Sequence, residues 1–326
     1  MLKYLIIFSG ALISGMLCIF LLARTSLKYK ILQARGIPLV GGLGIGIAFV
    51  FSSCLGVYVF GIAGAKILAV LGVSLLMLFF GIIDDLKELS ILQKFLAQSF
   101  CAALLISLGI MTDIMYLGFW GNAGVTFFWI LGITNAYNLL DIMDGLAAGT
   151  ALIVSSALLA IAFFTSDLNM QILSLILCAV TSGFLVFNLP PAKVYLGNSG
   201  SHFLGFMISA IALILHYASR NNAFALLSPV IILWLPITDT LLLIIFRIMK
   251  KRMPFKKSND HMAFRIRFSS SPIKTILVMF LLCFIFSFAG VVLTKATNFW
   301  ATGILMVMFL FSVILFWKLI KIDIHE

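Results

Sequence analysis

The chain has 326 residues, of which 63% are hydrophobic and 10% are charged, and its formal net charge is +11. A water-soluble domain of this composition would expose large apolar patches, so the composition excludes a soluble globular protein and indicates a polytopic membrane protein. The five cysteines lie inside apolar segments without a CxxC or Cys/His spacing, so they support neither a redox nor a zinc function.

Apolar runs of roughly 20 residues, separated by short polar breaks and without period-2 alternation, favour spanning helices over a barrel. We therefore expect an all-α fold with about 11 transmembrane helices. The first apolar run is longer than the core of a typical signal peptide, so we interpret it as an uncleaved span. Without a repeat or a linker, one membrane domain covering 1–326 is expected. The expected spans are 3–23, 38–60, 64–83, 95–111, 122–137, 146–164, 170–189, 201–219, 223–246, 274–294 and 299–319.

Positive charge is distributed unevenly across these spans. If the spans alternate in direction, 18 of the 22 Lys and Arg residues fall on one side. Because Lys and Arg mark the cytoplasmic face, we expect the N-terminus outside and the C-terminus inside. The same alternation places every polar cluster discussed below on the cytoplasmic side.

An acid pair, Asp84 and Asp85, ends the third expected span. An acid at the centre of a membrane helix costs roughly 3 kcal/mol, so acids gathered at helix ends suggest a polar reaction site. Adjacent residues diverge by about 100° on a helix, so both can face one ligand only where the helix ends. Two such carboxylates can hold a divalent cation together with substrate phosphates. The alternative is a solvated loop whose acids balance nearby lysines.

Asn135, Asn138, Asp141 and Asp144 recur at every third position and form a polar ridge. A 3₁₀ or broken final turn would align all four side chains. Two carboxylates and two amides suit an ion or a ligand carrying phosphates and hydroxyls. An amide ladder for helix packing is the alternative, although two added acids would make it costly.

Three further features lie on the expected cytoplasmic side. The glycine-rich segment Gly197–Ser201 opens a span and would present free N–H groups to an anion, or would serve packing alone. The segment 247–274 carries nine basic residues, most of which anionic lipids would explain. Within it, His261 and Arg265 are four residues apart, a spacing suited to a diphosphate. Asp239, near the end of the ninth expected span, is positioned to orient a basic neighbour.

In chain order, the sequence contains IPLVGG (37–42), GIIDDLKELS (81–90), NAYNLLDIMDGL (135–146), YLGNSGSHFLGF (195–206), PITDT (236–240) and DHMAFR (260–265). This ordered set closely resembles the polyprenyl-phosphate N-acetylhexosamine-1-phosphate transferases of glycosyltransferase family 4, in particular the undecaprenyl-phosphate GlcNAc-1-phosphate transferase-like branch. The phospho-N-acetylmuramoyl-pentapeptide transferases belong to the same superfamily. The resemblance covers nearly the whole chain.

The resemblance implies a Mg²⁺-dependent enzyme in the inner (plasma) membrane, multi-pass, with its active site facing the cytoplasm. Its substrates would be a UDP-N-acetylhexosamine and a polyprenyl phosphate, and UMP would be released. No nucleic-acid partner is expected, and a homodimer is compatible with the resemblance. The implied catalytic residues are Asp84, Asp85, Asp141, Asp144 and His261. The implied substrate-binding residues are Lys94, Asn135, Gly197, Ser201 and Arg265. The implied metal ligands are Asp85, Asn138 and Asn198.

Three departures from the family pattern matter. Asn198 stands where the family usually has an acid, and a neutral amide is the weaker Mg²⁺ ligand. Ile142 replaces the glycine that usually follows Asp141. The histidine-rich loop is reduced to Asp260-His261, which argues against the pentapeptide branch.

The sequence is also compatible with two other functions. A catalytically weakened relative that only binds lipid phosphate would fit Asn198 and Ile142. A transporter is a third reading, but its ionisable residues should lie near mid-membrane between two related halves, whereas these acids crowd one face.

Overall fold

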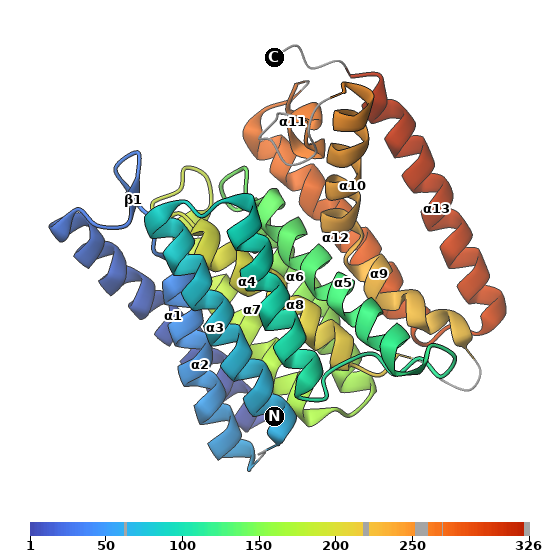
Figure 1. The fold of residues 1–326 in the computed structure, drawn as a ribbon, viewed down its shortest axis with the longest axis horizontal. Helices are drawn as coiled ribbons and strands as arrows, with labels where there is room; N and C mark the ends of the chain where they lie inside the picture. Colours follow the sequence, from blue (N-terminus) through green and yellow to red (C-terminus); the bar gives the residue numbers. More distant parts are fainter. Residues whose placement is uncertain (62–63, 218–221, 252–259, 269, 323–326) are drawn as a thin grey trace. The chain divides into compact units, whose positions relative to one another are not determined.

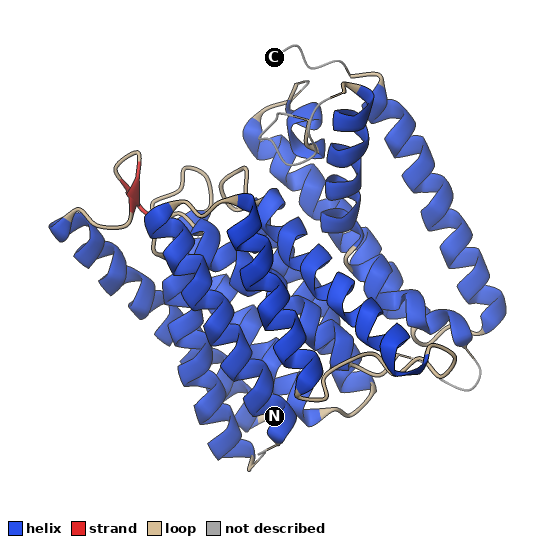
Figure 2. Ribbon diagram, viewed as in Figure 1, coloured by secondary structure: helices blue, strands red, loops and turns tan. Residues whose placement is uncertain are grey.

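A computed structural model describes residues 1–61, 64–217, 222–251, 260–268 and 270–322. Helices make up nearly all of the regular structure, and a short antiparallel hairpin of β1 (Gln33–Ala34) and β2 (Ile37–Pro38) is the only sheet found in these ranges (Figure 2). The expected all-α, membrane-spanning class is confirmed.

The chain divides into two compact units, Met1–Leu215 and His216–Glu326. The helices of the N-terminal unit are α1 (Leu2–Tyr29), α2 (Gly41–Phe60), α3 (Ala65–Lys87), α4 (Ile91–Ser107), α5 (Gly118–Leu140), α6 (Leu146–Phe164), α7 (Leu168–Asn188) and α8 (Gly197–Ile214). The helices of the C-terminal unit are η1 (Ala223–Leu227), α9 (Ser228–Ile232), α10 (Trp234–Met249), α11 (Met262–Arg267), α12 (Pro272–Leu293) and α13 (Asn298–Ile320).

Each expected span overlaps helical structure, but the number of spans is not settled as eleven. In the part of the chain that the structure describes, nine helices are long and apolar enough to cross a membrane. Helix α4 has 17 residues and falls short of that length. The orientation of the termini remains a prediction.

The expected span 223–246 is not one continuous helix. The segment is broken at Leu233, and its two parts, Ala223–Ile232 and Trp234–Met249, are bent by 69°. Pro236 explains the break, because it has no N–H to donate to the carbonyl of Ile232 and its ring would clash there. If the bent pair counts as one span, the described residues hold up to 10.

In the N-terminal unit, the hairpin and the loops α3–α4, α5–α6 and α7–α8 lie at one end of the bundle, and the N-terminus lies at the other end (Figure 1). The acid pair, the acids of the ridge and the glycine-rich segment therefore share one end of this unit. This shared end is what alternating spans predict.

Glycines allow α2, α3 and α8 to approach one another closely at that end. A Cβ on Gly42 would lie 2.0 Å from the backbone nitrogen of Gly200, and a Cβ on Gly81 would lie 2.5 Å from the Cα of Ser199. The first turn of α2 also hydrogen bonds to the residue before α8, since Gly42 N–H donates to the carbonyl of Leu196 at 2.9 Å. The IPLVGG motif thus fixes the start of α8.

In the C-terminal unit, α12 packs against α9 and α10. The rings of Trp234 and Phe286 stack with their centroids 3.8 Å apart. Trp234 Nε1 donates to the hydroxyl of Ser312 on α13 at 2.9 Å. These contacts hold the helices that carry the polar residues of this unit.

Candidate active site

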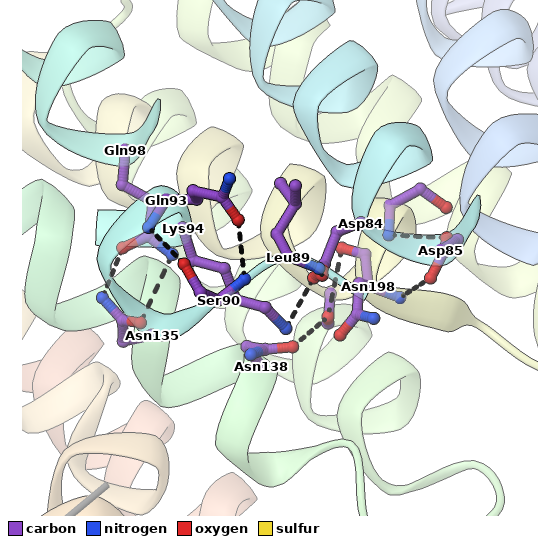
Figure 3. Close-up of polar contacts among 12 residues, drawn as sticks. Asp84, Asp85, Leu89, Ser90, Gln93, Lys94, Gln98, Asn135, Asn138 and Asn198 are labelled. Atoms are coloured by element: carbon purple, nitrogen blue, oxygen red, sulfur yellow. Dashed lines mark hydrogen bonds and ion pairs between the residues drawn. The ribbon is translucent and has the colours of Figure 1, made fainter. Parts of the chain in front are cut away.

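Asp84 is buried at the last turn of α3, where a short connection leads into α4. Glu88 ends α3 in the left-handed conformation, and Ser90 with Gln93 forms a capping box that starts α4. This tight connection brings Lys94 to 2.7 Å from Asp84 Oδ2, while Leu89 N–H donates to Oδ1 at 2.9 Å (Figure 3). Lys94, predicted to bind substrate, is therefore the cationic partner of Asp84, one of the predicted catalytic residues.

Asp85 points to a different neighbour, as the divergence of adjacent helical residues predicts. Its Oδ1 accepts the N–H of Asn198 at 2.7 Å, and its Oδ2 accepts the N–H of Ser199 at 3.0 Å (Figure 3). A carboxylate at a helix N-terminus satisfies free N–H groups and complements the helix dipole. Asp85 on α3 thus caps α8 from another helix.

Gly197 makes this cap possible. Its φ is +77°, which favours glycine, and an added Cβ would lie 2.8 Å from Asp85 Oδ2. The glycine-rich segment does present N–H groups to an anion, but in this structure the anion is the side chain of Asp85. Whether a substrate phosphate also binds at Gly197 remains a prediction.

The polar ridge does not act as one aligned row. Helix α5 continues through Leu140, and the chain then turns before α6. Asn135 Nδ2 donates to Gln98 Oε1 at 2.5 Å, and Gln98 Nε2 donates to Asn135 Oδ1 at 3.3 Å (Figure 3). Asn138 accepts from the hydroxyl of Ser201 at 3.0 Å. Asn135 therefore joins α5 to α4, and Asn138 joins α5 to α8.

The two acids of the ridge lie in the turn and differ in their partners. Asp144 accepts the N–H of Ala192 at 3.0 Å. Asp141 has no hydrogen bond within the described ranges. Burial, together with the negative charges of Asp85 and Asp144, raises the pKa of the Asp141 carboxyl to about 7. Of the four acids at this end, Asp84 alone forms an ion pair among the described residues.

The donor set fits a hard divalent cation. Mg²⁺ prefers oxygen ligands and keeps several waters, so one or two carboxylates suffice. Among the described residues, no three His, Cys, Asp or Glu side chains form a metal cluster, and two of the three predicted ligands, Asn138 and Asn198, are amides. The Asn198 side chain makes no hydrogen bond to the described residues and is partly exposed, so its oxygen remains available to a cation.

The C-terminal unit holds a second polar cluster, on α10, on α11 and in the segment before α11. His261 Nδ1 lies 2.7 Å from Asp239 Oδ2, and Met262 N–H donates to Asp239 Oδ1 at 2.7 Å. Asp239 does orient a basic neighbour. Asp260 pairs with Lys250 at 2.8 Å and with Arg265 at 3.4 Å.

Arg265 has a packing role that the sequence did not suggest. Its guanidinium lies 3.5 Å above the centre of the Phe246 ring. It also donates to the carbonyls of Leu319, at 3.0 Å, and Ile322 at the end of α13. A cation at a helix C-terminus is stabilising, so Arg265 ties α11 to α13. Its predicted contact with a diphosphate is untested, and 252–259 of the same basic segment lies outside the described residues.

Two relationships in the N-terminal unit escaped sequence analysis. One had a signal, because the Ser90-x-x-Gln93 capping box places Lys94 about one turn into α4 and near Asp84. The other, between Asp85 and the start of α8, joins residues 113 positions apart and left no local pattern.

Comparisons with known proteins identify the family to which the chain belongs. The model of a family described as glycosyl transferase family 4 matches residues 67–216. The chain is 36% identical over 288 residues to a probable undecaprenyl-phosphate N-acetylglucosaminyl 1-phosphate transferase of Bacillus subtilis, covering 85% of this chain and 79% of that protein.

Two other relatives are more distant. A decaprenyl-phosphate N-acetylglucosaminephosphotransferase of Mycobacterium tuberculosis is 30% identical, covering 65% of this chain and 60% of its own length. A phospho-N-acetylmuramoyl-pentapeptide-transferase of Halalkalibacterium halodurans is 32% identical, covering 56% of this chain and 62% of its own length. The chain therefore belongs to glycosyl transferase family 4 and is a membrane-embedded sugar-1-phosphate transferase.

Proposed function

We propose that this enzyme transfers N-acetylhexosamine-1-phosphate from a UDP-sugar to a polyprenyl phosphate such as undecaprenyl phosphate. The reaction releases UMP and starts a lipid-linked glycan of the cell envelope. The observation that carries the proposal is the gathering of Asp84, Asp85, Asp141 and Asp144 at one end of the N-terminal unit, with Lys94 beside them. The names of the relatives supply the substrate class, since two of them act with a polyprenyl phosphate and N-acetylglucosamine phosphate.

The physical state of the substrates places the reaction at a membrane surface. The lipid acceptor must stay in the bilayer and the nucleotide sugar is a soluble anion, so the acids belong at the interface. The excess of Lys and Arg on the same side of the spans supports the cytoplasmic face of the inner membrane.

In the proposed reaction, an oxygen of the lipid phosphate forms a bond to the phosphorus that carries the sugar. The bond between that phosphorus and the bridging oxygen of UMP breaks, and UMP leaves with the electron pair. Asp84 is suited to accept the proton of a monoprotonated lipid phosphate, because it is buried and Lys94 holds its carboxylate in one orientation.

Mg²⁺, when bound, would offset the repulsion between two phosphorylated reactants. Asp85, Asn138 and Asn198 are the residues proposed to hold it. Asp85 contributes to this site in two ways, since it also fixes the backbone from which Asn198 projects. Asp141 and Asp144 are proposed to lie near the nucleotide and the diphosphate.

The test uses purified protein, polyprenyl phosphate, Mg²⁺ and a panel of UDP-N-acetylhexosamines, with UMP release as the readout. Release with at least one donor is expected, and release that depends on the lipid identifies the acceptor. Asp113→Asn, which changes an exposed acid in the loop before α5, is the matched control for substitutions of the site acids. Absence of UMP with every donor would instead favour the lipid-phosphate-binding relative that Asn198 and Ile142 suggest.

A further inference from the structure

Asp239 is a buried carboxylate whose two oxygens are both used. It lies on α10, three residues beyond Pro236, and is 1% exposed. His261 Nδ1 lies 2.7 Å from one oxygen, and the N–H of Met262 donates to the other at 2.7 Å. A single side chain on α10 thus holds both the imidazole and the first backbone N–H of α11.

This arrangement determines how the imidazole presents itself. An ionised carboxylate only accepts hydrogen bonds, so the His261 nitrogen facing Asp239 must carry a proton. In the neutral ring, Nε2 is then the acceptor. Nε2 has no hydrogen-bond partner among the residues the structure describes, so it is the nitrogen that remains for a ligand.

The neighbouring basic side chains pair with Asp260, whereas Asp239 pairs with His261. Lys250 and Arg265 both pair with Asp260, at 2.8 Å and 3.4 Å. The ring of Phe264 meets the imidazole edge-on, with the centroids 6.2 Å apart. The ring is therefore fixed by a hydrogen bond on one side and by packing on another.

We propose that Asp239 is a positioning residue for the transfer reaction, because it fixes the tautomer and orientation of His261 and leaves Nε2 as the nitrogen presented to a substrate phosphate. This inference rests on the proposed function for its catalytic consequence. Asp239 is the aspartate of the PITDT motif, and in this proposal it affects the reaction only by orienting His261, without touching the substrate itself.

The first experiment needs no activity. The chain has four histidines, so ¹⁵N-histidine labelling of the untagged protein in detergent gives few signals, and His261→Gln identifies the one of interest. The wild type should show His261 protonated at Nδ1. In Asp239→Asn the amide group can donate to Nδ1, so the proton should move to Nε2. An unchanged His261 signal in this variant would overturn the proposal.

The matched control is Asp167→Asn. Asp167 is also a carboxylate that accepts a helix N-terminal N–H, that of Met170 at 3.1 Å, but it contacts no histidine. The control should leave the His261 signal and turnover unchanged. A His261 shift in the control would show that loss of any helix-capping carboxylate perturbs the ring, and the specific role of Asp239 would fall.

The second experiment measures turnover. Asp239→Asn should lower kcat by about 10- to 100-fold, the range typical for residues that orient a functional histidine, while KM for the UDP-sugar changes much less. In a His261→Gln background, Asp239→Asn should cause no further loss, because a residue that acts only through His261 has nothing left to orient. Additive losses would mean that Asp239 acts independently of His261. If the wild type releases no UMP, the proposed function fails and the catalytic role of Asp239 fails with it, while the labelling result still decides the tautomer.

Discussion

The two polar clusters of this enzyme are both built around aspartates, but they differ in how those aspartates are paired. In the described part of the C-terminal unit, Asp239 faces the ring nitrogen of His261, and Asp260 faces Lys250 and Arg265. In the N-terminal unit, Asp84 pairs with Lys94, but Asp85, Asp141 and Asp144 form no ion pair among the described residues, and Asp141 has no hydrogen bond there either.

The difference separates two tasks. Balanced charges fix side chains in place, and the C-terminal cluster uses them to order His261 and the end of α13. Unbalanced carboxylates are costly to keep together, and they persist where a cation or a proton relieves the repulsion. We therefore expect the N-terminal cluster to bind metal and phosphate, and the carboxylates of the C-terminal cluster to hold His261 and Arg265 in place.

The largest expected effect comes from Asp84→Asn. An amide cannot accept a proton, so UMP release per folded molecule should fall by about 10²- to 10⁴-fold, the range for loss of a general base. The protein should still insert into the membrane, because the Leu89 N–H keeps an acceptor. Asp113→Asn should retain wild-type turnover. Full activity of Asp84→Asn would remove the base from the proposed mechanism.

The corresponding change in the C-terminal cluster sharpens the comparison. Asp260→Asn removes a carboxylate that pairs with both Lys250 and Arg265, so the midpoint of thermal unfolding should drop more clearly than turnover per folded molecule. A turnover loss as deep as that of Asp84→Asn, at unchanged stability, would break the division into site and support.

Gly81→Ala should be next in size. Its Cβ would lie 2.5 Å from the Cα of Ser199, a backbone atom that cannot rotate away, so α8 must shift from the carboxylate of Asp85. Overpacking of this kind costs about 1–3 kcal/mol, and displacing a site by 1 Å can cost on the order of 10²-fold in rate. Thermal unfolding and UMP release measure the two effects.

Gly72→Ala is the matched control for this change. Gly72 lies on the same helix, and a Cβ there would meet nothing within 4 Å. It should be neutral or slightly stabilising, because alanine favours helices over glycine. Equal losses in both variants would mean that helix α3 tolerates no added methyl group, and the contact with α8 would lose its significance.

A smaller effect is expected from Asn198→Asp. A charged oxygen binds Mg²⁺ more strongly than an amide oxygen does, so the Mg²⁺ concentration for half-maximal rate should fall several-fold. The substitution adds charge to the unbalanced cluster, so it should also lower stability in metal-free buffer. An unchanged Mg²⁺ requirement, with the activity retained, would place Asn198 away from the ion.

Local patterns predicted the elements better than they predicted the partners. Hydropathy located the long apolar helices but not the short α11, and charge alternation placed the acids at one end of the N-terminal unit. The break at Leu233 could also be predicted from the sequence, because Pro236 prohibits a continuous helix. The capping of α8 by Asp85 could not be predicted, since it depends on how closely glycines let α3 and α8 approach. The regular spacing of the polar ridge likewise did not predict its partners on other helices. Asn135 pairs with Gln98 on α4, and Asn138 pairs with Ser201 on α8.

The smallest predicted effect concerns Asp141 and pH. Its pKa is about 7 in the folded protein and near 4 in an unfolded chain, so between these values the folded state binds the proton more tightly. Stability in metal-free buffer should therefore decrease as the pH rises from 5 to 7.5. Asp141→Asn should flatten this dependence, whereas the exposed-acid variant Asp113→Asn should keep the wild-type slope. Mg²⁺ should also flatten it in the wild type, because a cation near Asp85 and Asp144 removes part of the repulsion that raises the pKa. Thermal unfolding at several pH values measures all three, and identical slopes for wild type and Asp141→Asn would show that the N-terminal acids are as well balanced as those around His261.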